Sequence, residues 1–134
     1  MTAGTIFLAK LIGLYCILVS VAMAVHEQLT IETLIALMHD APLLFITGLV
    51  SLAAGLAMVL SHNVWSGGAL PVIITLIGWA TLIKSLLILL LTPMQEAQIF
   101  LGGLHYAEFF YVYAAITFVL GAYLTYAGFT ASRD

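Results

Sequence analysis

The chain has 134 residues, of which 64% are hydrophobic and only 7% are charged, and its formal net charge is −3. Soluble domains carry about 25% charged residues, so this composition cannot cover a water-exposed surface and is typical of a protein in a bilayer. The three Lys and Arg residues form no basic patch, which argues against nucleic-acid binding. The single cysteine, Cys16, excludes a cysteine-pair motif, and the length fits one domain over residues 1–134.

Four stretches are apolar over about 20 residues, which is the length needed to cross a membrane. The second stretch begins at an N-cap, Asp40, with Pro42 in its first turn, and Pro93 stops the third. In lipid every backbone amide must be paired within the protein, and these stretches are too long for barrel strands. We therefore expect an all-α, four-helix transmembrane bundle with spans at residues 5–25, 41–60, 69–91 and 105–128.

The connections that follow the first and third spans have a helical character of their own. Residues 28–38 place Ile31, Leu34 and Met38 at helical spacing, and residues 95–101 are similar in composition. Each segment is predicted to form a short helix in the membrane interface. An ordinary extramembrane cap over the bundle is the alternative.

The distribution of charge gives an orientation. Lys10 and Arg133 lie near the chain ends, whereas the connections after the first and third spans carry acids, among them Glu27 and Glu96. The positive-inside rule then favours cytoplasmic termini. A short multispan chain of this kind is typical of a prokaryotic inner membrane, which is the location we expect.

The two halves of the chain resemble each other. The segment Leu-Ile-Gly at 11–13 recurs at 76–78, and Ser20 matches Ser85 at the same offset of 65 residues. Chance matches between apolar sequences are the alternative explanation. A true repeat would be parallel, and its two helical hairpins would be related by a pseudo-two-fold axis along the membrane normal.

Small residues follow one face of the second and fourth spans. Ser51 and Gly55 lie four residues apart in the second span, and Thr117 and Gly121 do so in the fourth. Small side chains let helix backbones approach each other in lipid. We expect these residues to face neighbouring helices, within the bundle or in a dimer.

The third span contains a lysine, Lys84, about two-thirds of the way along its length. A lone ammonium at the centre of a span costs roughly 2.5–3.5 kcal/mol on insertion scales, so it needs a partner or a wet cavity. Glu108, expected one turn into the fourth span, is the predicted partner. The pair has two interpretations: a buried structural ion pair, or a site for an ion, a proton or an anionic ligand.

Three of the four histidines, His26, His39 and His105, belong to the side that carries the acids. His39 and His105 occupy equivalent positions in the repeat, so a metal or a bis-histidine haem held between the halves is conceivable. Polar helix caps at the interface are the simpler explanation. The segment His62-Asn63-Val64-Trp65 ends the second span, and we interpret it as a turn with Trp65 as an interface anchor.

No arrangement of residues resembles a catalytic site, so no catalytic residue and no cofactor is expected. The favoured hypothesis is a non-catalytic protein that acts by association, as an accessory or assembly subunit or a lipid-binding module. Its partners would be the bilayer, a larger membrane complex or further copies of itself. One alternative is a transporter or channel that uses Lys84 and Glu108. The other is a metal- or haem-binding redox protein that uses His39 and His105.

Overall fold

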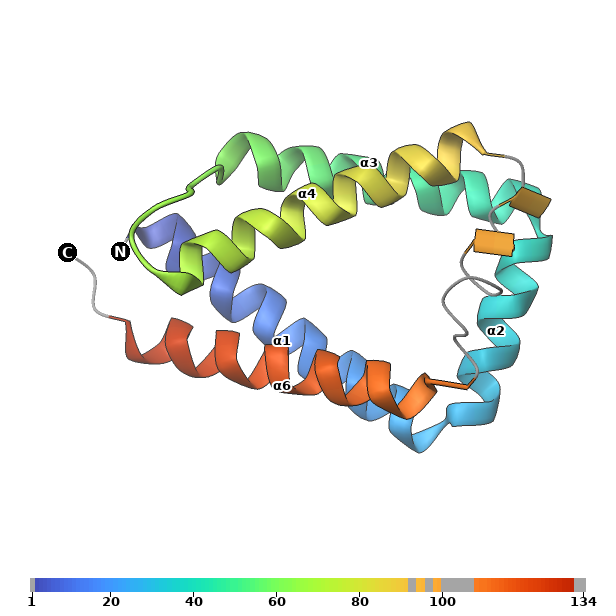
Figure 1. Cartoon of the computed structure of the whole chain (residues 1–134), viewed down its shortest axis with the longest axis horizontal. Coiled ribbons are helices and arrows are strands. Elements are labelled where there is room, and N and C mark those ends of the chain that lie inside the picture. Colours follow the sequence, from blue (N-terminus) through green and yellow to red (C-terminus); the bar gives the residue numbers. More distant parts are fainter. Residues whose placement is uncertain (1, 92–93, 96–97, 100–107, 132–134) are drawn as a thin grey trace.

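The structure is a computed structural model that describes residues 2–91, 94–95, 98–99 and 108–131. In this part of the chain it is all-α (Figure 1). Every labelled helix except α2 is long and apolar enough to cross a membrane, which confirms the predicted multi-pass fold. The helices in chain order are α1 (Ala3–Val25), α2 (Glu27–His39), α3 (Ala41–Ser61), α4 (Ala69–Leu90) and α6 (Phe110–Thr130).

Side-chain caps fix the beginnings of two spans. The Thr2 hydroxyl oxygen accepts a hydrogen bond from the Thr5 amide at 3.3 Å, which starts α1. Asp40 Oδ1 accepts from the Leu43 amide at 3.0 Å, and Pro42 lies in the first turn of α3, as the sequence predicts. Each cap satisfies one of the amides that a helix leaves unpaired at its beginning.

The predicted bounds of the fourth span need correction. The helix begins at Phe110, residues 108–109 form a turn, and residues 105–107 lie outside the described residues. No Ser, Thr, Asp or Asn side chain caps this helix, so apolar composition alone placed the predicted start too early. The helix continues past Gly128 to Thr130, and Gly128 packs against Ala9 and Lys10 of α1 instead of ending the helix.

The spans pack as two helix pairs. α1 lies along α6, and α3 lies along α4, whereas α1 and α4 share a much shorter contact (Figure 1). The consecutive spans α1 and α3 are not packed as one hairpin, because α2 runs across the end of the molecule between them. Of the two predicted short helices, α2 matches the first, and the second falls largely on residues that are not described.

Glycines bring the helices of each pair into backbone contact. A methyl group placed on Gly121 of α6 would lie 2.8 Å from Gly13 O and 2.9 Å from Ile17 N. A methyl group placed on Gly55 of α3 would lie 2.8 Å from Leu82 N. Only glycine permits such an approach. Ser51 and Thr117, the other residues predicted to face helices, are half-buried.

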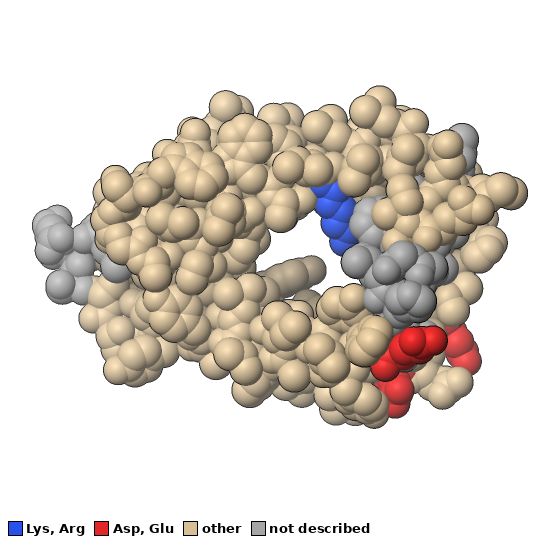
Figure 2. Space-filling view, in the orientation of Figure 1, with Lys and Arg blue, Asp and Glu red and all other residues tan. Residues whose placement is uncertain are grey.

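The two pairs meet at one end and diverge toward the other. The joint end, where α1 begins and α6 ends, holds a cluster of nearly inaccessible apolar side chains from three helices: Ala9 of α1, Leu70 and Ile74 of α4, and Leu124 of α6. At the opposite end, the α2 end, α2 bridges the separated pairs (Figure 1). The described acidic side chains of Figure 2 gather at the α2 end.

Candidate functional site

A space between the two helix pairs is the most distinctive feature of the molecule. Figure 2 shows an opening through the molecule, bounded by α1 and α6 on one side and by α3 and α4 on the other. The helices on both sides are membrane spans with mean hydropathies between 1.5 and 2.4. The opening therefore lies at the depth of the hydrocarbon and is open sideways toward the bilayer.

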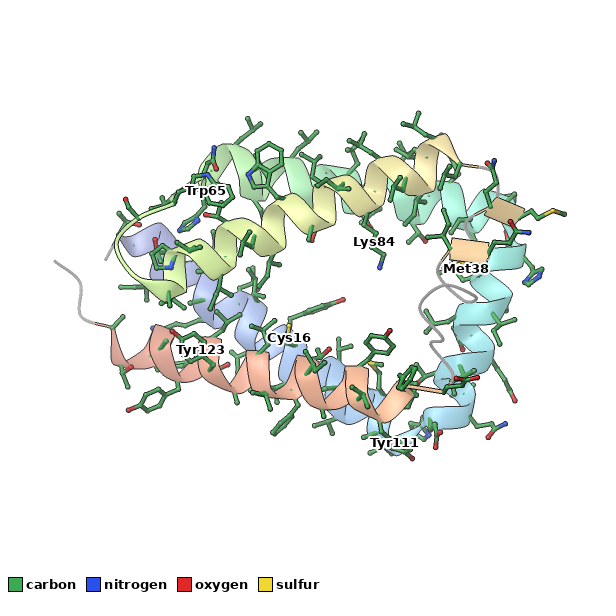
Figure 3. All side chains as sticks on the ribbon, viewed as in Figure 1. Cys16, Met38, Trp65, Lys84, Tyr111 and Tyr123 are labelled. Carbon is green, nitrogen blue, oxygen red and sulfur yellow. The ribbon has the colours of Figure 1, made fainter. Side chains whose placement is uncertain are left out.

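Lys84 points into this opening. It lies on α4, and its side chain extends from that helix toward the opposite helix pair (Figure 3). A basic side chain is the blue group at the rim of the opening in Figure 2. The structure thus turns the cation of the third span toward the space between the pairs and not toward the outside of the bundle.

Glu108, the predicted partner of Lys84, lies in the turn before α6 at the α2 end. The expectation that it sits one turn inside the fourth span is wrong, because that helix begins at Phe110. A carboxylate in this turn is closer to the membrane interface than one within the helix. The ion pair between Lys84 and Glu108 stays a prediction.

A buried histidine links the two helix pairs at the joint end. His62, which follows α3, is only 4% exposed. Its Nε2 lies 2.9 Å from Thr5 Oγ1 of α1, and its Nδ1 lies 3.3 Å from Thr75 Oγ1 of α4. We call Thr5, His62 and Thr75 the polar joint. Both ring nitrogens have partners, so the imidazole is buried without the cost of an unpaired polar group.

The surrounding hydrogen bonds give the polar joint a direction. Two carbonyl oxygens compete for the single Thr75 hydroxyl proton: Val64 O at 2.9 Å and Pro71 O at 3.0 Å. A neutral His62 therefore donates its Nδ1 proton to Thr75 and accepts the Thr5 hydroxyl proton at Nε2. Every hydroxyl proton of the polar joint then has an acceptor, which holds α1, the α3–α4 turn and α4 in a fixed register.

The turn next to the polar joint is also held by side chains. Asn63 Oδ1 accepts from Trp65 Nε1 at 2.7 Å and from Trp79 Nε1 at 3.3 Å. Trp65 is exposed at the joint end, a position that suits the predicted interface anchor. From the sequence, His62 is predicted to be part of a turn. The signal in the sequence that pointed to a link between the helix pairs was the distinctive His-Asn-Val-Trp segment at the end of a span.

The histidines considered for a metal or haem do not converge within the described residues. His26 and His39 stand at opposite ends of α2, about 20 Å apart at 1.5 Å per residue. His39 Nδ1 lies 2.7 Å from the Ile35 carbonyl oxygen, and His105 lies outside the described residues. Where the chain is described, no three His, Cys, Asp or Glu side chains are placed to hold a metal ion together.

Two apolar grooves lie near the α2 end, one on each helix pair. The groove on the α1–α6 pair has a volume of about 360 Å³, and Tyr111 lies at its edge, where its hydroxyl donates to Glu27 Oε2 at 2.6 Å. The groove on the α3–α4 pair has a volume of about 140 Å³. The first is lined by Ser20, Val21, Ala24, Tyr111, Ala114, Ala115 and Phe118, and the second by Ala41, Leu44, Phe45, Ile88, Leu89 and Leu91.

No protein-family model matches the chain, and neither the curated proteins nor the solved structures contain a significant match. The features of the molecule that bear on its function are the opening, Lys84 and the polar joint.

Proposed function

We propose that the protein is a non-catalytic membrane module that works by association and binds a lipid in the opening between its helix pairs. The observation that carries this proposal is the opening itself, which lies between apolar spans and faces the bilayer sideways (Figure 2).

Physical chemistry favours a lipid over water in this space. Apolar walls give water few hydrogen-bond partners. If the opening were empty, the side chains that line it would lack dispersion contacts on that side. Acyl chains restore those contacts without burying a polar group. The apolar grooves at the α2 end, with volumes of about 360 and 140 Å³, offer further surface to acyl chains on each pair.

We also infer that the chain is a parallel tandem duplication, with α1 and α4 related by an offset of 65 residues and α3 and α6 by 66. Ser20 and Ser85, which match at the first offset, donate to the carbonyl oxygens of Ile17 and Leu82 at 2.9 and 2.7 Å. Every buried residue of α1 has a buried counterpart in α4: Thr5 and Leu70, Ile6 and Pro71, Ala9 and Ile74, Gly13 and Gly78, Ser20 and Ser85.

The contacts between helices support the same inference. Gly121 packs against Ile17, and its counterpart Gly55 packs against Leu82, the counterpart of Ile17. A two-fold rotation that exchanges α1 with α4 and α3 with α6 also converts one helix pair into the other. Its axis would run along the membrane normal through the opening.

The proposed repeat is broken at the polar joint. Gly128 occupies the position equivalent to His62, and Lys10 occupies the position equivalent to Thr75. Gly128 lies against Lys10, whose ammonium stands 4.5 Å from the centroid of the Phe129 ring. The two copies therefore use the same contact in different ways, and only one of them forms a hydrogen-bonded link between the pairs.

The location that we propose is the cytoplasmic membrane of a prokaryote, with both termini in the cytoplasm. α1 begins and α6 ends at the same end of the molecule, and the described acids lie at the other end (Figures 1 and 2). The positive-inside rule favours the cytoplasmic side for the end that carries Lys10.

The test is native mass spectrometry of the full chain released from lipid nanodiscs. We expect the protein to retain a lipid at a collision energy that strips loosely held lipids. The same spectrum reports whether the protein is a monomer, a homo-oligomer or part of a complex. A protein that emerges bare, under conditions where a known lipid-binding membrane protein keeps its lipid, would contradict the proposal.

One observation favours a second function, the transport of an ion or a proton: Lys84 points into the opening (Figure 3). Proteoliposomes loaded with a pH-sensitive dye distinguish the two functions. A lipid-binding module gives no flux above that of empty liposomes. A proton or ion flux that Lys84→Met abolishes would replace the lipid-binding proposal.

A further inference from the structure

We propose that the lipid in the opening carries an anionic headgroup, a carboxylate or a phosphate, which binds to the Lys84 ammonium. The inference rests on the proposed lipid-binding function. It adds the chemical class of the ligand, the direction in which it lies and the residue that selects it.

Lys84 has the position that a headgroup contact requires. It lies six residues before the end of α4 at Leu90, which is about 9 Å along the helix axis at 1.5 Å per residue. The ammonium therefore lies within about two helical turns of the end of α4 on the α2 side, and it points into the opening (Figure 3).

The depth of the opening matches one leaflet. From Lys84 to Ile74, a member of the closed core at the joint end, α4 rises by about 15 Å. The hydrocarbon of a bilayer is about 30 Å thick, so this distance is half of it. A lipid whose head binds Lys84 would place its chains along the opening and end them at the core formed by Ala9, Ile74 and Leu124.

Charge selects the headgroup. An ammonium has three N–H donors, so Lys84 can keep a contact with the protein while it binds an oxygen of a ligand. A carboxylate or phosphate oxygen makes a charge-assisted hydrogen bond with it. A phosphocholine headgroup also has phosphate oxygens, but its own quaternary ammonium cancels their charge and repels the lysine.

The acidic residues at the α2 end decide from which side the ligand arrives. Glu27, Glu32 and Asp40 lie on or beside α2 at the α2 end. Their charge repels dissolved anions such as inorganic phosphate. An anionic lipid avoids this barrier because it enters sideways from the leaflet, where the opening faces the bilayer (Figure 2).

The experiment uses the full chain in nanodiscs of phosphatidylcholine doped with equal small amounts of phosphatidylglycerol and a saturated fatty acid. Native mass spectrometry then identifies the retained lipids. We expect the wild type to enrich an anionic lipid at least five-fold over its share in the disc, and the mass tells whether the head is a phosphate or a carboxylate. Inorganic phosphate added at millimolar concentration should leave this enrichment unchanged.

Three variants assign the selection to one side chain. Lys84→Met should retain lipid but lose the enrichment, and Lys84→Arg should restore it. Lys10→Met is the matched control, because Lys10 is the other described lysine within a span and lies over the Phe129 ring at the joint end. It should keep the enrichment. Size-exclusion profiles and circular dichroism confirm that each variant is folded.

The possible failures are distinguishable. A wild type that retains lipids in the proportions of the disc overturns the anionic selection but leaves the lipid-binding function in place, and so does enrichment that persists in Lys84→Met. Displacement of the lipid by inorganic phosphate overturns the membrane route. A wild type that retains no lipid overturns the proposed function together with this inference.

Discussion

Gly121 of α6 lies directly against the backbone of Ile17 of α1. A methyl group on Gly121 would stand 2.9 Å from the Ile17 amide nitrogen, closer than real side-chain carbons come to any neighbour. Gly55 of α3 has the same relationship with Leu82 of α4. Each helix pair is therefore held by a contact in which backbone meets backbone, and neither side has a flexible side chain that can move away.

Gly121→Ala and Gly55→Ala should each destabilise the protein. The added methyl group forces the helices apart, and overpacking of this kind typically costs about 1–3 kcal/mol, more than the roughly 1 kcal/mol that alanine gains in helix propensity. The free energy of unfolding, measured by titrating the micelle-bound protein with a denaturing detergent, reports the change.

Gly4→Ala is the matched control for both variants. Gly4 lies in α1, and a methyl group there would have no neighbour within 4 Å. This variant should be neutral or stabilised by up to about 1 kcal/mol, since only helix propensity changes. Equal effects of all three substitutions would show that the close contacts do not hold the pairs.

His62→Leu should destabilise the junction of the helix pairs by about 1–3 kcal/mol, because it removes two buried hydrogen bonds worth about 0.5–1.5 kcal/mol each, those of the imidazole with Thr5 and Thr75. In a double-mutant cycle with Thr5→Val, the combined loss should be smaller than the sum of the single losses, because both variants remove the same 2.9 Å hydrogen bond. The unfolding free energies of the four proteins give the coupling.

His39→Ala is the control for His62→Leu. It lies on exposed α2 and should stay within about 0.5 kcal/mol of the wild type. Strictly additive effects of His62→Leu and Thr5→Val on the free energy of unfolding would contradict a linking role of the polar joint.

Lys84→Met and Glu108→Gln test the predicted ion pair. If the two charges pair, each single substitution leaves the other charge without its partner, whereas the double substitution removes both. The double variant should then be at least as stable as the less stable single variant, with a coupling above about 0.5 kcal/mol. Unfolding in detergent again gives the values. Additivity within that margin would mean that Lys84 and Glu108 do not pair.

Tyr111→Phe should loosen the α2 end without affecting the whole molecule. The hydroxyl joins the first turn of α6 to Glu27 of α2 at 2.6 Å, but the bond is exposed, so its loss should cost less than about 1 kcal/mol. Hydrogen exchange should rise at the beginnings of α2 and α6. Tyr126→Phe is the control, since Tyr126 is exposed near the other end of α6. Unchanged exchange in Tyr111→Phe would show that this bond does not hold α2.

The spans could be predicted from the sequence because the signals that define them are local. Apolar length identifies a span, and Asp40 with Pro42 marks the beginning of α3 by chemistry that lies within four residues. α6 has no such cap, and there the prediction placed the helix start five residues too early.

The arrangement of the spans depends on contacts between distant residues and was not predictable in the same way. The glycines at 55 and 121 indicated that helices approach each other, but a glycine does not indicate which helix packs against it. In the structure Gly121 packs on α1. His62 looked like a turn residue because its partners, Thr5 and Thr75, are 57 and 13 residues away in the chain. The opening could not be predicted either, because it depends on how distant helices pack. Lys84 indicated only that the third span has an unusual environment.

The helix that bridges the pairs gives the molecule unequal ends. α2 lies across the spans and is about 20 Å long, so the pairs and whatever lies between them take up more area in the leaflet beside α2 than in the opposite leaflet. A protein with this wedge shape strains a flat bilayer. The strain is relieved when the bilayer bends so that the leaflet beside α2 expands. The free energy of insertion therefore depends on membrane curvature, and the protein should concentrate where the membrane bulges toward α2.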